Sequence, residues 1–148
     1  MGTSTAIPAG GASPTRVIII DDHEITRAAY SALLRAEGTD VIADLGSSGQ
    51  AITAARTHRP DVAIIDVTPA AGTGFGIADR LRALSIPPIV ILTSSTDRTQ
   101  FGARLDGHLF IAKADICAAA IARLARTPKR RTRTTSPGTP ADRPRPTG

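Results

Sequence analysis

The sequence predicts an α/β fold in which helices cover both faces of one parallel sheet. The first observation is a set of short apolar runs rich in Val and Ile, each bounded by turn-forming residues, which is typical of strands buried on both faces. The second is that these runs alternate with segments whose apolar residues recur every three or four positions, as in amphipathic helices. The third is that most of the runs end at a polar or charged residue. Strand and helix alternate five times, so we expect a doubly wound (βα)5 domain.

The first strand–helix unit begins with the apolar run at residues 16–20, which is followed by Asp21-Asp22. We expect Asp22 to cap the next helix and Gly38 to end it, because these residue types favour the two helix ends. The apolar residues of this helix recur at spacings of three and four, and we expect them to face the sheet. They are Ile25, Ala28, Ala29, Ala32, Leu33 and Ala36.

The next two strands lie on either side of a second helix. Residues 40–45 give a weaker strand pattern. Ser47 or Ser48 is positioned to cap the helix that follows, which ends before Pro60. The run at residues 60–66 is fully apolar between its two aspartates, and it places Asp66 at the end of a buried strand.

The second half of the chain repeats the pattern with shorter elements. A helix carries Ile77, Leu81 and Leu84, and the strand at residues 89–92 ends in Thr93. Only a short helical face follows, formed by Phe101 and Leu105 and weakened by Gly102. The last strand is expected at residues 108–112, directly before Lys113. Asp115 is then expected to cap a final helix with one apolar side, formed by Cys117, Ile121 and Leu124.

Composition bounds the rest of the chain, which has 148 residues. We expect a disordered segment at 1–14, one domain at 15–126 and a disordered tail rich in Pro, Thr and Arg at 127–148. One cysteine excludes an internal disulfide, and the chain has neither a signal-peptide pattern nor a membrane-spanning window. These features predict a cytoplasmic protein that does not insert into membranes.

Charge is distributed unevenly along the chain. The segment from Arg126 to Gly148 holds seven basic residues and one acidic residue, whereas the remainder is nearly neutral. Such a tail can contact nucleic acid or an acidic partner through charge alone, but a solvated tail without specific binding is the favoured interpretation. Lysine is scarce, with only Lys113 and Lys129 among 18 basic residues. The lysine inside the predicted domain therefore calls for a role that arginine would not fill.

The polar strand ends predict a reactive site, because the carboxyl ends of parallel strands meet at one edge of a sheet. They are Asp21, Asp22, Asp66, Thr93 and Lys113. Crowded carboxylates repel one another unless a cation neutralises them, and Mg²⁺ prefers such oxygen ligands. A carboxylate nucleophile, a cation, a hydroxyl and an ammonium together are suited to phosphoryl transfer onto Asp66.

With these residues in this order, the chain from Val17 to about Ala125 resembles the receiver domain of two-component response regulators. The resemblance implies a flavodoxin-like fold with sheet order 2-1-3-4-5. It also implies that Asp66 accepts a phosphoryl group from a sensor histidine kinase. Asp21, Asp22, Asp66 and the backbone carbonyl of Thr68 would hold Mg²⁺. Apart from its own phosphorylation and dephosphorylation, such a domain is not an enzyme.

The resemblance also implies a switch, in which Thr93 turns toward the phosphoryl group and Phe110 rotates inward. The switch would change a face that binds a downstream protein or a second receiver. Three features depart from the family pattern: Pro69-Ala70 stand where Met-Pro is usual, Ala114 follows the lysine in place of proline, and the segment from Thr93 to Lys113 is short. The last departure predicts a stunted fourth helix.

Two alternatives remain open at this point. A small phosphohydrolase of the haloacid dehalogenase type also uses an Asp, a Thr or Ser, and a Lys at strand ends. That family places a second Asp where this chain has Thr68, and its acid pair follows the lysine, so the receiver interpretation is favoured. The other alternative is a degenerate receiver that binds partners without phosphorylation. Too few residues follow the last helix for a helix-turn-helix output domain, so we expect either a stand-alone receiver or a remnant of a longer regulator. The sequence does not identify its kinase or its output.

Overall fold

The computed structural model describes residues 13–68 and 73–126, which contain five strands joined by helices. The elements, in chain order, are β1 (Arg16–Ile20), α1 (Glu24–Ala36), β2 (Asp40–Leu45), α2 (Ser48–His58), β3 (Val62–Asp66), α3 (Thr73–Arg82), β4 (Ile89–Ser94), the 3₁₀ helix η1 (Arg98–Leu105), β5 (Leu109–Ala112), the 3₁₀ turn η2 (Lys113–Asp115) and α4 (Ala118–Arg126). The predicted segments at 1–14 and 127–148 fall almost wholly outside the described residues, as do Pro69 and Ala70. None of the helices in the described ranges has the length and apolar character needed to cross a membrane.

All five strands are parallel, and their order is β2-β1-β3-β4-β5. This confirms the predicted fold and sheet order. The order reverses between β1 and β3, which run side by side with Ile20 opposite Ile65. Such a reversal is where open α/β sheets form their ligand crevice, at the carboxyl ends of the strands. The topology therefore places the residues after β1 and at the end of β3 beside each other.

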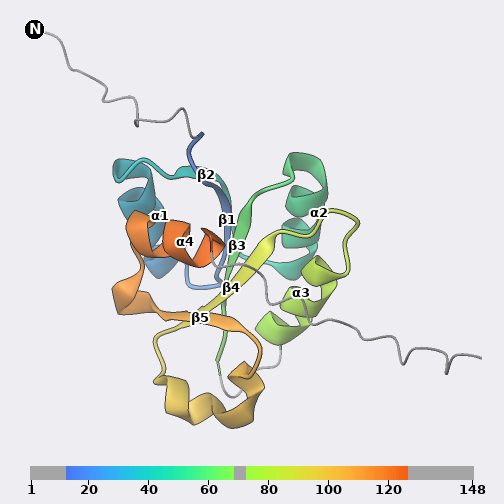
Figure 1. The fold of residues 1–148 in the computed structure, drawn as a ribbon, viewed down its shortest axis with the longest axis vertical. Coiled ribbons are helices and arrows are strands. Elements are labelled where there is room, and N and C mark those ends of the chain that lie inside the picture. The colour runs from blue at the N-terminus through green and yellow to red at the C-terminus, as the bar shows by residue number, and fades with distance from the viewer. Residues whose placement is uncertain (1–12, 69–72, 127–148) are drawn as a thin grey trace, which may run out of the picture.

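Helices cover the sheet on both faces: α1 and α4 lie on one side, and α2 and α3 on the other (Figure 1). Alternate residues of the central strands point to opposite faces. Val17 and Ile19 belong to the core under α1 and α4, while Ile18 and Ile20 belong to the core under α2 and α3. The first three of these are wholly inaccessible to solvent. Each such side chain contributes about 1.5–3 kcal/mol through removal of apolar surface from water.

Helix α1 turns a different face to the sheet from the one predicted. The predicted apolar face is exposed along its whole length, with Ile25 87% and Leu33 45% exposed and the four alanines exposed as well. The buried residues are Tyr30, Ser31 and Leu34. The prediction was wrong because it counted only apolar residues. Polar contacts of the inward face, such as the hydrogen bond from Ser31 to Asp44, select the other side of the helix.

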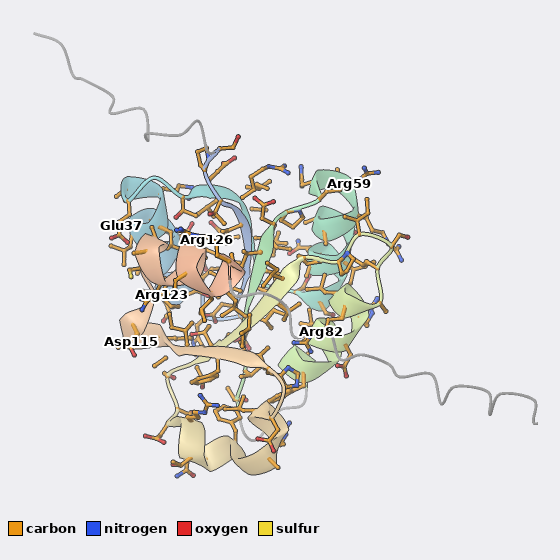
Figure 2. The ribbon with its side chains drawn as sticks, viewed as in Figure 1. Glu37, Arg59, Arg82, Asp115, Arg123 and Arg126 are labelled. Carbon is orange, nitrogen blue, oxygen red and sulfur yellow. The ribbon has the colours of Figure 1, made fainter. Side chains whose placement is uncertain are left out.

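Two predicted helix caps were also wrong. Residue His23, not Asp22, occupies the N-cap of α1, and Asp21 accepts the hydrogen bond from its backbone N–H at 2.8 Å. Asp115 lies within η2, three residues before α4 begins and so two residues too early to cap it, at the left edge of the molecule in Figure 2. The first N–H group of α4 instead donates to Glu37, which follows the end of α1.

Two other predicted features are confirmed. Ser47 is the N-cap of α2 and accepts a hydrogen bond from the N–H of Gln50. The fourth helical segment is short, since η1 is a 3₁₀ helix broken at Gly102, whose φ of 55° and ψ of −137° suit glycine. Phe101 and Leu105 are both buried against the sheet, as their spacing predicted.

Candidate functional site

The structure brings the predicted strand-end residues together at one edge of the sheet. Asp21 follows the last residue of β1, and Asp66 is the last residue of β3. Asp66 pairs in register with Thr93 on β4, and Lys113 follows the last residue of β5. The placement follows from parallel strands of similar length, so that a residue at the end of one strand lies near the ends of its neighbours.

Two ion pairs join these residues. The Nζ atom of Lys113 lies 2.9 Å from Oδ2 of Asp21 and 2.9 Å from Oδ1 of Asp66. The side chains are almost buried, with exposed fractions of 12% for Lys113, 0% for Asp21 and 9% for Asp66. Charge pairs with so little solvent around them interact more strongly than exposed pairs. Lys113 therefore holds both carboxylates in fixed positions at the strand ends.

The three carboxylates also form a candidate cation site. One oxygen from each of Asp21, Asp22 and Asp66 lies within 4.8 Å of the other two. Asp22 is exposed, so the group opens to solvent on one side. Carboxylate oxygens that share one opening with solvent fit Mg²⁺, which takes one or two carboxylates and keeps several waters. The donor set thus fits the ion that the sequence predicted.

The electrostatics of the group follow from burial and crowding. Burial raises the pKa of Asp66 above its ordinary value, and the charges of Asp21 and Asp22 raise it further, while Lys113 partly offsets the rise. Burial alone would lower the pKa of Lys113, but its hydrogen bonds to Asp21 and Asp66 outweigh this effect and raise it. Lys113 therefore stays charged, and a further cation would favour the ionised form of Asp66.

Thr93 has an unsatisfied hydroxyl. Its Oγ1 atom is buried and, among the described residues, has no hydrogen-bond partner. A buried polar group without a partner costs about 1–3 kcal/mol, and such groups call for an explanation. Thr93 pairs with Asp66 across β3 and β4, so an acceptor attached to Asp66 would supply the missing partner. The hydroxyl of Thr93 is therefore available to a hydrogen-bond acceptor near Asp66.

A cavity of about 210 Å³ opens beside the carboxylates. Besides Asp21, Asp22 and Asp66, its lining includes four hydroxyl-bearing residues and two glycines: Ser47, Ser48, Thr68, Thr73, Gly46 and Gly74. Thr68, the predicted carbonyl ligand, is exposed on this lining.

Gly74 brings α3 close to the end of β3. A Cβ atom at this position would lie 2.5 Å from the carbonyl oxygen of Asp66 and 2.6 Å from the side chain of Val67. Neither approach is sterically allowed, so only glycine lets α3 begin this near the end of β3.

Phe110, the predicted switch residue, lies on β5 in register with Leu92 of β4, one residue before Thr93. Its ring is half-buried and packs at 6.0 Å from the ring of Phe101 on η1. Phe101 in turn contacts Phe75 on α3 at 6.2 Å. The three phenylalanines of the chain thus form one connected row, so that a movement of Phe110 would disturb both η1 and α3.

Sequence reasoning missed two residues that contact the site. Tyr30 donates a hydrogen bond to Asp21 Oδ2 at 3.2 Å, and Arg27 donates one to the Asp21 carbonyl oxygen at 2.6 Å. Both lie on the inward face of α1, which the periodicity of apolar residues did not predict. The signal that could have revealed them is the spacing of Arg27, Tyr30, Ser31 and Leu34 on one helical side, directly after the acid pair.

A sequence model described as the response regulator receiver domain matches residues 17–116. Among curated proteins, the transcriptional regulatory protein PdtaR of Mycobacterium tuberculosis is 32% identical over 96 residues, which are 65% of this chain and 47% of that protein. The DNA-binding response regulator MtrA of Mycolicibacterium smegmatis is 38% identical over 82 residues, which are 55% of this chain and 36% of that protein. The chain thus spans less than half the length of these relatives.

Solved structures agree with the fold. The signal receiver domain of the response regulator NarL from Mycobacterium tuberculosis superposes with a TM-score of 0.65 at 24% sequence identity. The superposition covers 78% of this chain and 99% of that domain. At this identity the likeness shows the shared receiver architecture.

Proposed function

The chain belongs to the response regulator receiver family, and from this premise we propose that it accepts a phosphoryl group on Asp66 from a sensor histidine kinase. The observation that carries the proposal is the geometry around Asp66. Its carboxylate is paired with Lys113 at 2.9 Å, grouped with two further carboxylates, and adjacent in register to the unsatisfied hydroxyl of Thr93. Each of these features suits a site that gains a phosphoryl group.

The transfer would use residues that the structure already positions. An ionised oxygen of Asp66 attacks the phosphorus of a phosphohistidine, and a new O–P bond forms as the N–P bond breaks. The bonding electron pair returns to the imidazole nitrogen of the donor. Lys113 neutralises charge on the transferred phosphoryl oxygens, and Thr93 donates a hydrogen bond to one of them.

Magnesium completes the proposed site. Asp21, Asp22 and Asp66, with the backbone carbonyl of Thr68, would hold Mg²⁺, whose positive charge lowers the repulsion between the carboxylates and the incoming phosphoryl group. The same residues would support the slow hydrolysis by which a receiver resets itself. This self-dephosphorylation is part of the proposal. We also propose a cytoplasmic location, because the kinase domain that donates the phosphoryl group would have to be in the same compartment. We also propose that residues 15–126 form the complete receiver unit.

The exposed side of α1 is a candidate docking surface for the kinase. Its apolar stripe begins at Ile25, three residues after Asp22, and therefore starts at the rim of the acidic site. An exposed apolar stripe beside the acidic site is suited to contact with another protein. A partner bound along this stripe would hold its phosphohistidine near Asp66. The downstream partner, or a second receiver, would bind the face that contains η1, β5 and α4.

Two alternatives from the sequence are not favoured. The phosphohydrolase interpretation required a second Asp at the position of Thr68, and the family match identifies a receiver domain instead. The degenerate-receiver interpretation predicts damage to the acidic group, but the structure keeps the carboxylates, Lys113 and Thr93 together.

The test uses the full chain with a small acyl phosphate and Mg²⁺. Intact-mass spectrometry should show the addition of one phosphoryl group to the wild type and none to Asp66→Asn, since an amide is not a nucleophile here. Ile25→Asp should retain labelling by the acyl phosphate but lose labelling by a phosphorylated histidine kinase. An unlabelled wild-type protein would refute the phosphoacceptor proposal, and equal kinase labelling of Ile25→Asp would refute the docking surface alone.

A further inference from the structure

Asp21 is held by more donors than a simple metal ligand needs. Its Oδ1 atom accepts from the N–H of His23 at 2.8 Å, and its Oδ2 atom accepts from both Tyr30 and Lys113, at 3.2 and 2.9 Å. Its backbone carbonyl accepts from Arg27 at 2.6 Å. The residue itself is 1% exposed. The position and rotamer of this carboxylate are therefore fixed from several directions.

Tyr30 is the donor whose role remains to be explained. Lys113 also pairs with Asp66, and His23 contributes only its backbone, whereas the Tyr30 hydroxyl contacts Asp21 through a single side-chain bond. The ring is 6% exposed and packs in the core under α1 and α4. A phenylalanine would fill the same space in this core. The hydroxyl is thus an addition that packing alone does not require.

The position of the Tyr30 hydroxyl points to a role beyond packing. It reaches the oxygen of Asp21 that Lys113 also contacts, so Oδ2 keeps a donor when Lys113 turns toward a phosphoryl group on Asp66. Without that donor, Asp21 would lose a constraint on its rotamer at the moment when the site gains charge. Groups that hydrogen-bond to a metal ligand in this way orient it and tune its affinity for the ion.

We propose that Tyr30 is a positioning residue for the cation site: its hydroxyl orients Asp21 toward Mg²⁺ through the bond to Oδ2. The inference rests on the proposed function, because it concerns the cation that Asp21 would hold. The proposal also accounts for the inward face of α1. Arg27 and Tyr30 lie there and both bind Asp21, whereas the apolar pattern had predicted that the alanines would face inward.

The chain offers a matched pair of variants for the test. Tyr30→Phe removes the hydroxyl that contacts Asp21 and keeps the buried ring. Ser31→Ala removes the neighbouring buried hydroxyl of the same helix, which donates to Asp44 at 3.2 Å and, within the described part of the chain, makes no hydrogen bond to Asp21. Both lose one hydrogen bond from α1 to a carboxylate, the Tyr30 bond being buried and the Ser31 bond partly buried, so a general effect on stability should appear in both.

Mg²⁺ binding to the full chain would be measured by isothermal titration calorimetry, with melting curves as the check on folding. Tyr30→Phe should raise the dissociation constant for Mg²⁺ roughly tenfold, the usual effect of losing a group that orients a metal ligand. Ser31→Ala should leave it unchanged. Equal dissociation constants for Tyr30→Phe and the wild type would overturn the positioning role while leaving the proposed function intact. A wild type that does not bind Mg²⁺ would overturn both.

A second measurement needs no variant. The chain contains one tyrosine and no tryptophan, so its near-ultraviolet fluorescence comes from Tyr30. Phenol emission depends on the acceptor of the hydroxyl proton, so Mg²⁺ bound by Asp21 should change the emission of Tyr30. The midpoint of this change should match the calorimetric dissociation constant. If calorimetry detects binding and the emission stays constant, the Tyr30–Asp21 bond does not couple to the cation, and the inference is wrong.

Discussion

Lys113 bridges Asp66 to the acid pair: its Nζ atom lies 2.9 Å from Asp66 Oδ1 and at the same distance from Asp21 Oδ2. One ammonium thus pairs with two carboxylates, while the third carboxylate, Asp22, faces solvent. The arrangement leaves the group with a net negative charge that a cation can neutralise. Phosphorylation would redistribute these pairs, because a phosphoryl group on Asp66 competes with Asp21 for Lys113.

The first prediction concerns the titration of Asp66. In metal-free protein its carboxyl should titrate above the ordinary value of 3.8, because burial and the neighbouring carboxylates raise its pKa. Lys113→Gln should move the midpoint higher still, since the Lys113 hydrogen bond lowers it, and Lys113→Arg should keep it nearer the wild-type value. Protonation of Asp66 favours the folded state, and this contribution is lost as pH rises through the folded-state pKa. Carboxyl-detected NMR measures the midpoint, and a wild-type value at or below 3.8 would contradict the prediction.

The second prediction concerns Gly74. Gly74→Ala places a Cβ against the backbone of Asp66, so α3 or β3 must shift, at a cost of about 1–3 kcal/mol in unfolding free energy. The shift should also slow phosphorylation by an acyl phosphate. Gly76→Ala is the matched control, because a Cβ there meets no atom within 4 Å and should stabilise the helix by about 1 kcal/mol. Urea denaturation separates the two, and equal stabilities would show that α3 does not need its close approach.

The third prediction concerns the hydroxyl of Thr93. Thr93→Val removes an unpaired buried polar atom at nearly constant shape, so it should leave the unphosphorylated protein unchanged or more stable by about 1 kcal/mol. The same change should weaken binding of a phosphoryl mimic, which loses its hydrogen-bond donor. Thr93→Ser keeps the hydroxyl and should retain that binding. Thermal melts with and without the mimic measure both effects. A Thr93→Val protein that loses stability without the mimic would show that the hydroxyl has a partner after all.

The fourth prediction concerns the switch. If Phe110 moves on phosphorylation, its contact with Phe101 at 6.0 Å should change, and so should the resonances of η1 and β5. Phe110→Ala should lower the stability by less than the roughly 3–5 kcal/mol typical of a fully buried phenylalanine, and should alter phosphorylation-dependent association. Phe110→Leu keeps apolar volume without the ring. It should therefore preserve more of the stability than of the phosphorylation-dependent association. NMR shifts and light-scattering masses with a phosphoryl mimic test this, and shifts confined to the acidic site would argue against the switch.

The strand-end residues whose placement was predicted share one property: their positions follow from the parallel sheet. Once the strands are identified, the geometry of parallel pairing places Asp66 beside Thr93 and brings Lys113 to the same edge. The order of the strands was also predictable, because the resemblance rests on residues at those same ends. Local hydrogen bonds did not enter into any of these predictions.

The features that were missed depend on contacts between elements. Apolar spacing in α1 predicted an inward face at Ile25 and Leu33, yet the fold buries Tyr30 and Leu34 and turns Ile25 outward. Similarly, Asp115 has the residue type of a helix cap, but the first N–H of α4 is satisfied by Glu37 from a distant part of the chain (Figure 2). The periodicity of apolar residues describes the composition of a helix face. It does not reveal which polar groups of other elements that face will contact.

If a kinase docks on the exposed stripe of α1, as proposed, the small residues of the stripe would limit the lifetime of the complex. Four of its six residues are alanine, so Ile25 and Leu33 supply its only large apolar side chains. A contact with two anchors and little buried area belongs to the weak, transient class, in which dissociation is fast. Short residence suits a carrier, since each copy must leave its phosphoryl donor before the next can be charged. The alanines would thus favour turnover over tight capture, and replacing them with leucines should lengthen the complex lifetime and reduce the number of receivers that one kinase charges.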